Sequence, residues 1–405
     1  MPGKKSINFN KFGNVLINTD GRGEGSVITY MLKNNHGDSI IVSEYTIKED
    51  YDAIRETYYH LGNILCDSLS VPYLPYALAD QYVARTPMSG KYPILLEEWK
   101  DLSTQIVACL QVCKAFKELY SKSFFIKDFD RSNVGINPQS GKVNIDIFGC
   151  IEYLNKFKLE QIIPGRYVLP LDEMQNMMEE PEKCIGFTLA VLLFEILLGC
   201  HPFEGRKLAT MAFIKEGDRI VNYGEKRVFI FDPQNNENAP IPGEQTKVTT
   251  RWVSLPEEIR DAFIKVFVEK HYFLPQEWSG LIEGMKKNIY TCPCCKKITF
   301  IKIHESIPCI WCGNSIDATF VLKNQFNEKI IPLVEGSEIK DDLGREILGK
   351  VLRANGRLII KNVSNQPWDA FTPSGIQKQL PINGTMPVNV GIKVKIGVNT
   401  YKIEQ

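Results

Sequence analysis

The segment SFFIKDFDRSNVGINPQSGKVNIDIFG, residues 123–149, decides how the first part of the chain folds. Its apolar residues predict short strands at 124–126, 134–136 and 143–147, with polar loops between them. Those loops carry Asp128, Asn133 and Asp146. Phosphoryl transfer needs a carboxylate beside the attacking hydroxyl, and a second carboxylate plus an amide oxygen to hold Mg²⁺. A lone DxxxxN pattern is weak, so the third residue and the strands carry this interpretation.

The three residues resemble the catalytic loop and the magnesium-binding loop of protein kinases. Asn133 lies five residues and Asp146 eighteen residues after Asp128, and both separations match that family. The resemblance makes Asp128 the catalytic aspartate and assigns Asn133 and Asp146 to magnesium. It is closest to atypical bacterial Ser/Thr kinases of the YegI and TerY-associated type. The fold that it implies is α+β and bilobal, with ATP and Mg²⁺ as ligands.

Two further segments resemble the same family in the same order. GRGEGSVITY, residues 21–30, resembles the glycine-rich loop that covers the phosphates, with Gly21, Gly23 and Gly25 as the nucleotide contacts. FTLAVLLFEILLGCHPFEG, residues 187–205, resembles the buried helix of the kinase C-terminal lobe and its exit. The resemblance covers most of the chain before the cysteine-rich segment.

Several positions depart from an active kinase. Ser43 stands where the third strand should carry the lysine that binds the phosphates, and Glu56 is the candidate for its helix partner. Lys33 and Lys48 are the candidates for a relocated lysine. Leu171 replaces an acidic residue that normally pairs with an arginine.

These departures leave three interpretations. The favoured one is a degenerate kinase, a pseudokinase, that binds Mg-nucleotide and regulates partner proteins. The first alternative is an active Ser/Thr protein kinase. The second is a scaffold that binds no nucleotide, in which the three polar residues only brace their loops.

The segment CPCCKKITFIKIHESIPCIWCG, residues 292–313, predicts a metal site. Two CxxC pairs separated by thirteen residues suit a structural Zn²⁺ held by four thiolates in a zinc ribbon. Cys294 is expected to be a bystander, although an exchange with Cys295 stays open, and His304 is expected to be an exposed loop residue. The predicted ligands are Cys292, Cys295, Cys309 and Cys312.

The remaining chain predicts a small antiparallel β-sandwich. RLIIKNV at 357–363 and GIKVKIGVNTYKI at 391–403 alternate apolar and polar residues between glycine and proline turns. Trp368 is expected in its core. The run from 362 to 397 resembles the end of a forkhead-associated domain, but no clear phosphothreonine-binding set is present. An interaction module with a lost or altered phosphopeptide site is therefore favoured over a working reader.

Composition limits the function classes. With 48 basic and 48 acidic residues, nothing indicates binding to nucleic acid or to an anionic membrane. The N-terminus lacks the apolar run of a secretory signal, and the longest apolar run, 187–200, is short for a membrane span, so a cytoplasmic protein is expected. The family resemblance implies partners of the von Willebrand A type and a PP2C-type phosphatase.

The domain boundaries follow from these patterns. We expect a kinase-like N-lobe at 1–100, a C-lobe at 101–287, a zinc ribbon at 288–321 and the β-sandwich at 322–405.

Overall fold

The computed structural model describes residues 5–9, 12–17, 21–61, 66, 68–70, 78–87, 96–153, 165–170, 173, 183–209, 223–224, 226–327 and 329–405. The chain divides into two compact units. The first comprises Met1–Thr246 and Glu258–Glu283, and the second comprises Lys247–Glu257 and Gly284–Gln405. Within the described ranges, no helix has both the length and the apolar character needed to cross a bilayer.

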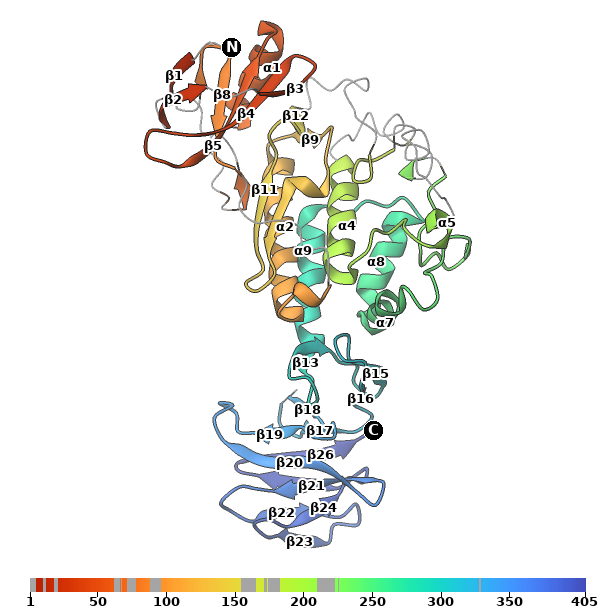
Figure 1. Ribbon diagram of the computed structural model, residues 1–405. Helices are drawn as coiled ribbons and strands as arrows, with labels where there is room; N and C mark the ends of the chain where they lie inside the picture. The colour runs from red at the N-terminus through yellow and green to blue at the C-terminus, as the bar shows by residue number, and fades with distance from the viewer. Residues whose placement is uncertain are drawn as a thin grey trace. The chain divides into compact units, whose positions relative to one another are not determined.

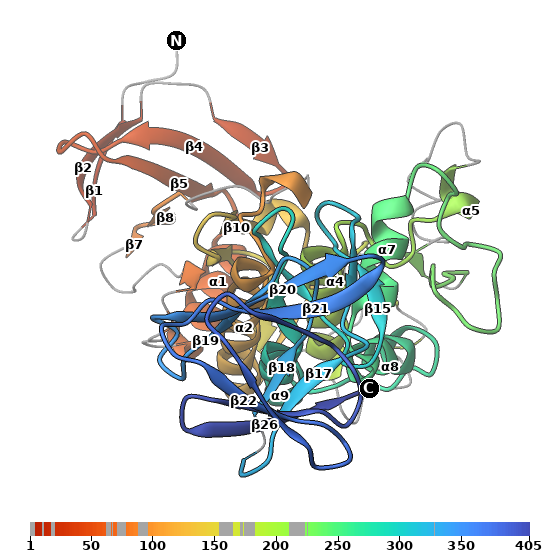
Figure 2. The same ribbon diagram turned by 90° about the horizontal axis from the view of Figure 1, so that it is seen from below.

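The first unit begins with strands. A separate hairpin pairs β1 (Lys5–Phe9) with β2 (Gly13–Ile17). The main N-terminal sheet has the order β3-β4-β5-β8-β7, and Figure 2 shows β3, β4 and β5 side by side. Its strands are β3 (Arg22–Glu24), β4 (Val27–Lys33), β5 (Ser39–Tyr45), β7 (Leu78–Ala79) and β8 (Tyr82–Arg85).

Helix α1 (Lys48–Leu61) follows β5 directly. Glu49 and Asp50 lie in its first turn, where carboxylates favour the positive end of the helix dipole. Its buried residues Tyr51, Tyr58 and Leu61 recur at spacings of seven and three, so they share one face. Through this face, α1 packs against the rest of the first unit.

The rest of the first unit is mostly helical. Its helices are α2 (Leu102–Ser121), α4 (Lys183–Leu198), α5 (Arg206–Ala209), α8 (Glu257–Phe267) and α9 (Pro275–Gly284). Figure 1 shows α2, α4, α8 and α9 side by side. Phe263 of α8 lies 5.1 Å, ring centre to ring centre, from both Phe194 of α4 and Trp278 of α9. Helix α4 is mostly apolar because other elements surround it, and its polar residues Thr188 and Glu195 are buried too.

Short strands connect the sheet with these helices. They are β6 (Leu69–Ser70), β9 (Phe124–Ile126), β10 (Val134–Asn137), β11 (Lys142–Asp146) and β12 (Ile151–Tyr153). β10 pairs with β11, and β9 pairs with β12, both antiparallel. The same part of the chain contains the single-turn helices η1 (Leu96–Glu98) and η2 (Arg131–Asn133).

A buried ion pair connects two distant segments of the first unit. The Arg227 Nη2 atom lies 2.7 Å from Glu173 Oε1, and both side chains are less than a tenth exposed. The Tyr272 hydroxyl also donates to Glu173, and the Arg227 guanidinium lies 4.9 Å from the centre of the Phe187 ring. Burial raises the pKa of Glu173, but Arg227, Tyr272 and Lys270, whose Nζ lies 3.2 Å from Glu173 Oε1, outweigh it and the net shift is downward. Leu171, which the sequence analysis placed at a position that is normally acidic, lies outside the described residues. The acidic residue that pairs with Arg227 is Glu173.

Loss of one partner of this buried ion pair should destabilise the protein far more than loss of an exposed charge. Arg227→Met should lower the free energy of unfolding by about 3 kcal/mol, because Glu173 would keep its buried charge without its main counter-ion. Urea unfolding followed by circular dichroism measures the change. Arg55→Met is the control, since Arg55 lies 3.6 Å from Asp52 on the exposed side of α1 and should have little effect. Equal losses in the two variants would contradict the assignment.

The second unit starts with helix α7 (Thr246–Ser254), whose residues from Lys247 onward belong to it. Arg251 of α7 is buried with its guanidinium 4.4 Å from the centre of the Trp311 ring, and Ser254 Oγ donates to the Pro308 carbonyl at 3.3 Å. The helix therefore packs on the cysteine-rich segment. The sequence analysis had placed it in the C-lobe.

The cysteine-rich segment forms two hairpins. The strands are β13 (Ile289–Thr291), β14 (Ile298–Phe300), β15 (Ser306–Pro308) and β16 (Ser315–Asp317), preceded by the short helix η5 (Met285–Asn288). β13 pairs with β14 and β15 pairs with β16.

The C-terminal residues form two antiparallel sheets. One has the order β18-β17-β26-β25-β22-β23 and the other has the order β19-β20-β21-β24. The strands are β17 (Val321–Asn324), β18 (Ile330–Pro332), β19 (Glu338–Lys340), β20 (Ile347–Ala354), β21 (Arg357–Asn362), β22 (Trp368–Phe371), β23 (Gln377–Leu380), β24 (Thr385–Pro387), β25 (Lys393–Ile396) and β26 (Asn399–Glu404).

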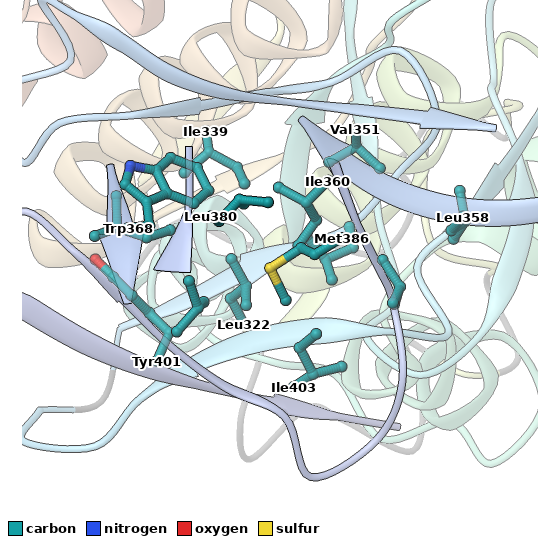
Figure 3. Packing of buried hydrophobic residues seen from close by; sticks show 14 residues of the cluster. Leu322, Ile339, Val351, Leu358, Ile360, Trp368, Leu380, Met386, Tyr401 and Ile403 are labelled. Carbon is teal, nitrogen blue, oxygen red and sulfur yellow. The ribbon is translucent and has the colours of Figure 1, made fainter. Parts of the chain in front are cut away.

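The two sheets share one core. Leu322 and Ile403 from one sheet, and Val351 and Ile360 from the other, belong to the same cluster of buried side chains (Figure 3). Trp368 is 2% exposed, and its indole N–H donates to Ser364 Oγ at 3.1 Å. The prediction that Trp368 is a core residue is confirmed.

Candidate functional site

Cys150 is the residue at which the three predicted site residues meet. The Asp128 amide donates to the Cys150 carbonyl at 3.3 Å, and Asn133 Nδ2 donates to Cys150 Sγ at 3.2 Å. The thiol in turn lies 4.0 Å from the Asp146 carbonyl oxygen. Burial, with the negative charges of Asp128 and Asp146, raises the pKa of the Cys150 thiol to about 12. The thiol is therefore neutral near pH 7 and can serve as donor and acceptor.

The local backbone holds Asp128 and Asn133 in place. Antiparallel pairing of β9 with β12 continues beyond the strands, where the Lys127 amide donates to the Cys150 carbonyl at 2.9 Å. Asp130 accepts from the Ser132 amide at 3.0 Å, and Asn133 Oδ1 accepts from the Asp130 amide at 2.9 Å. This reciprocal cap fixes the Asn133 side chain, whose amide oxygen retains a second lone pair for another ligand.

Helix α1 is anchored to the loop that follows Asp146. The Tyr58 hydroxyl donates to the Ile147 carbonyl at 3.0 Å and accepts from the Gly149 amide at 3.1 Å. Its ring stacks on Phe148 with the ring centres 5.4 Å apart. Burial raises the pKa of Tyr58 well above its usual value, so the phenol stays protonated. A neutral tyrosine thereby satisfies two backbone groups of the loop.

A second hydrogen bond of α1, made by Thr57, fixes the helix against β12. Thr57 Oγ1 donates to Glu152 Oε1 at 2.8 Å, and Lys127 Nζ lies 3.3 Å from Glu152 Oε2. Glu152 is buried, so its charge is balanced by Lys127 rather than by water. The position of α1 relative to Asp128 and Asp146 is therefore determined by hydrogen bonds on both sides.

Asp146 is paired with an arginine that the sequence analysis missed. Arg85 Nη1 donates to Asp146 Oδ2, and the Phe148 amide donates to Asp146 Oδ1 at 3.1 Å. The two ionic side chains are 16% and 14% exposed, and the Arg85 guanidinium lies 4.7 Å from the centre of the Phe148 ring. The only sequence feature that could have drawn attention to Arg85 is that it ends the otherwise uncharged strand YVAR. Its partner could not be predicted from spacing.

The predicted lysine position contains no cation. Ser43 is 2% exposed on β5, opposite Thr29 of β4 and Val83 of β8. Lys33 ends β4 on its exposed side. Lys48 forms an ion pair with Asp52 at 2.9 Å on the outside of α1. The structure therefore brings neither candidate for a relocated lysine to Asp146.

Glu56 lies away from the loop. Its side chain is about half exposed, and its carboxylate lies 3.7 Å from His60 Nε2, one turn further along α1. Thr57 and Tyr58 take the positions that face Glu152 and Gly149. Helical geometry explains this, because residue 56 is offset from the buried face by one or two positions.

The glycine-rich segment forms a hairpin. β3 and β4 pair through Gly23 and Ile28, and Gly25 has φ +60° in the turn between them. The turn is fastened to the start of α1, since the Thr46 amide donates to the Ser26 carbonyl at 2.8 Å and Ser26 Oγ donates to Asp50. A Cβ on Gly21 would clash with Ile28 and Tyr30, so packing alone is enough to require glycine at this position.

The four predicted metal ligands come together in the second unit. Their sulfur atoms all lie within 4.8 Å of one another, and Cys292–Cys312 and Cys295–Cys309 are each 3.8 Å apart. Four sulfurs at Zn–S distances of about 2.3 Å in a tetrahedron would lie about 3.8 Å apart. The four cysteines are therefore arranged to bind a metal ion such as zinc.

Each CxxC pair occupies the tip of one hairpin. The Lys296 amide donates to the Cys292 carbonyl at 3.0 Å, and the Gly313 amide donates to the Cys309 carbonyl at 2.9 Å. Both residues that follow a pair have positive φ, +63° at Lys296 and +74° at Gly313. The two turns are thus equivalent, and they bring the sulfur atoms together from two separate hairpins.

The charges around these sulfurs favour a bound cation. Burial raises the pKa of Cys292, but backbone amides of Cys295 and Cys294 donate to its sulfur and the net shift is downward. Burial, together with neighbouring thiols, raises the pKa of Cys295 to about 12. Four thiols this close cannot all ionise unless a cation balances them. Cys294 and His304 lie outside the cluster, and Cys294 is exposed with Asn314 Nδ2 2.7 Å from its sulfur.

Compared with known proteins, the sequence matches no family model and no curated protein.

The thiol cluster predicts a metal content that depends on four cysteines. The purified full chain should contain about one zinc ion, and Cys309→Ser should lose it because a thiolate ligand is gone. Elemental analysis by mass spectrometry measures the zinc content. Cys294→Ser is the matched control and should keep the metal. Zinc loss in that variant, or zinc retention in Cys309→Ser, would contradict the ligand set.

Proposed function

We propose that the first unit is a degenerate protein-kinase-like module that binds a nucleotide with Mg²⁺ and regulates partner proteins. The observation that carries this proposal is the convergence of Asp128, Asn133 and Asp146 on Cys150. Asp128 and Asn133 lie between β9 and β10, and Asp146 ends β11. Asp128 and Asp146 reach Cys150 through backbone groups, and the negative charges of both act on its thiol.

The order of elements supports the same proposal. A glycine hairpin is followed by the strand that carries Ser43, then by helix α1, which packs on the loop after Asp146. Kinases place their phosphate-binding lysine, their regulatory helix and their magnesium aspartate in this order. The proposal therefore rests on arrangement as well as on spacing.

In a catalytic version of this site, the residues would have distinct tasks. Asp128 would orient the acceptor hydroxyl, and Asn133 and Asp146 would hold Mg²⁺. The metal would neutralise phosphate charge when bound. Ser43 cannot bind phosphates as a lysine does, so we propose weak, unusual or absent phosphoryl transfer instead of efficient kinase activity.

A scaffold that binds no nucleotide is the second candidate. The ion pair of Arg85 with Asp146 favours it, because a guanidinium already balances the carboxylate that Mg²⁺ would need. In this version the kinase-like fold would serve as a surface for another protein.

For the second unit we propose a zinc ribbon joined to an interaction module. Three exposed apolar side chains, Phe326, Leu343 and Val398, lie on loops that Asp342 connects. Asp342 accepts from Lys329 Nζ at 2.5 Å and from Asn399 Nδ2 at 2.9 Å. Exposed apolar groups on ordered loops suit contact with a partner protein. A von Willebrand A-type protein or a PP2C-type phosphatase is the partner that the family resemblance implies.

Nucleotide binding tests the proposed function. Calorimetric titration of the full chain with ATP and Mg²⁺ or Mn²⁺ should give metal-dependent binding, and Asp146→Asn should abolish the dependence on metal because a ligand carboxylate is lost. Glu118→Gln on α2 is the control for loss of a carboxylate and should bind like the wild type. ATP labelled at the γ- or α-phosphate then identifies any group transferred.

The outcomes separate the two candidates. Metal-dependent binding that Asp146→Asn removes supports the nucleotide site. No binding to the wild type at millimolar ATP would overturn it and leave the scaffold.

A further inference from the structure

Arg85 lies on the same face of the N-terminal sheet as Ser43. Ser43 pairs directly with Val83 of the neighbouring strand β8, and Arg85 follows Val83 by two residues. Directly paired residues share a face, and so do residues two apart on one strand. Ser43 and Arg85 are therefore diagonal neighbours, with backbones about 8 Å apart. An arginine side chain is long enough to cover that separation.

The Arg85 side chain extends toward the Asp146 loop. Its Nη1 atom contacts Asp146, and its guanidinium lies over the Phe148 ring, 4.7 Å from the ring centre. The ion pair and the ring contact together restrict where the guanidinium can lie. A cation is thus held beside the predicted magnesium ligand by a strand adjacent to the one that lacks the lysine.

The guanidinium has hydrogen-bonding capacity to spare. Arg85 Nε is buried, and among the residues that the structure describes it has no hydrogen-bond partner. Buried donors without an acceptor are rare in folded proteins, and an absent ligand is one recognised reason for them. Phosphate oxygens, like carboxylate oxygens, accept two parallel N–H groups from an arginine. Asp146 can therefore keep one N–H while a phosphate accepts others.

Two lysines of this unit are engaged by other carboxylates. Lys127 is paired with buried Glu152, and Lys48 is paired with Asp52 outside α1.

We infer that Arg85 supplies the phosphate-binding cation that Ser43 cannot, so that the site takes the di- or triphosphate group of a nucleotide through an arginine from β8. This inference rests on the proposed nucleotide site and assigns its phosphate contact. It makes Arg85 a ligand-binding residue and not merely a counter-ion of Asp146.

The ratio of affinities for MgADP and adenosine tests the inference. Calorimetry on the full chain should show that Arg85→Gln weakens MgADP binding by about tenfold or more, the loss expected for charge-assisted hydrogen bonds. Adenosine binding should stay unchanged, because adenosine has no phosphate. Arg85→Lys should reduce MgADP affinity by less, since the charge remains. Arg55→Gln, on the exposed side of α1, is the matched control and should behave like the wild type.

The outcomes distinguish this inference from the proposed function. Wild-type binding with an unchanged or increased MgADP-to-adenosine ratio in Arg85→Gln overturns the inference alone, and an increase identifies Arg85 as a block to the metal. If Arg85→Gln does not fold, the same ratio in Arg85→Lys decides: a decrease supports the inference and an unchanged ratio overturns it. A wild type that binds neither MgADP nor adenosine overturns the proposed function itself.

Discussion

The double hydrogen bond of Tyr58 is the contact on which the site in the first unit depends. One phenol satisfies the Ile147 carbonyl and the Gly149 amide, and its ring packs on Phe148. The loop is thereby fixed between Asp146 and Cys150. In this position Asp146 accepts a hydrogen bond from Arg85, and the Cys150 sulfur accepts one from Asn133. A change in the position of α1 would therefore displace this loop.

Charge balance explains much of the remaining arrangement. Glu152 is paired with Lys127, and Asp146 is paired with Arg85, so these largely buried carboxylates are not left uncompensated. The four thiols of the second unit follow the same rule, because their sulfurs lie 3.8 Å apart in pairs and need a cation to ionise together. In both units, buried negative groups therefore depend on a nearby positive charge.

The sequence predicted what depends on local spacing. The two CxxC pairs lie in the short turns of two hairpins, and the structure brings their four sulfur atoms together. Asn133 and backbone groups of Asp128 and Asp146 lie at Cys150, and the magnesium and catalytic roles of the three residues stay predictions. Arg85 could not be predicted, because its role follows from strand register across β5 and β8. Glu173 was missed for a related reason: its partner Arg227 is distant in sequence. The contact of Arg251 in helix α7 with the Trp311 ring could not be predicted either, because nothing in the local sequence shows it.

A bound divalent ion would locate the proposed nucleotide site of the first unit. Crystals of the full chain grown with Mn²⁺ and a non-hydrolysable ATP analogue would show manganese by its anomalous scattering. We expect an anomalous peak within about 2.5 Å of an Asp146 carboxylate oxygen, with the phosphates beside it. Ordered Asp128, Asn133 and Asp146 side chains with no manganese and no nucleotide among them would contradict it.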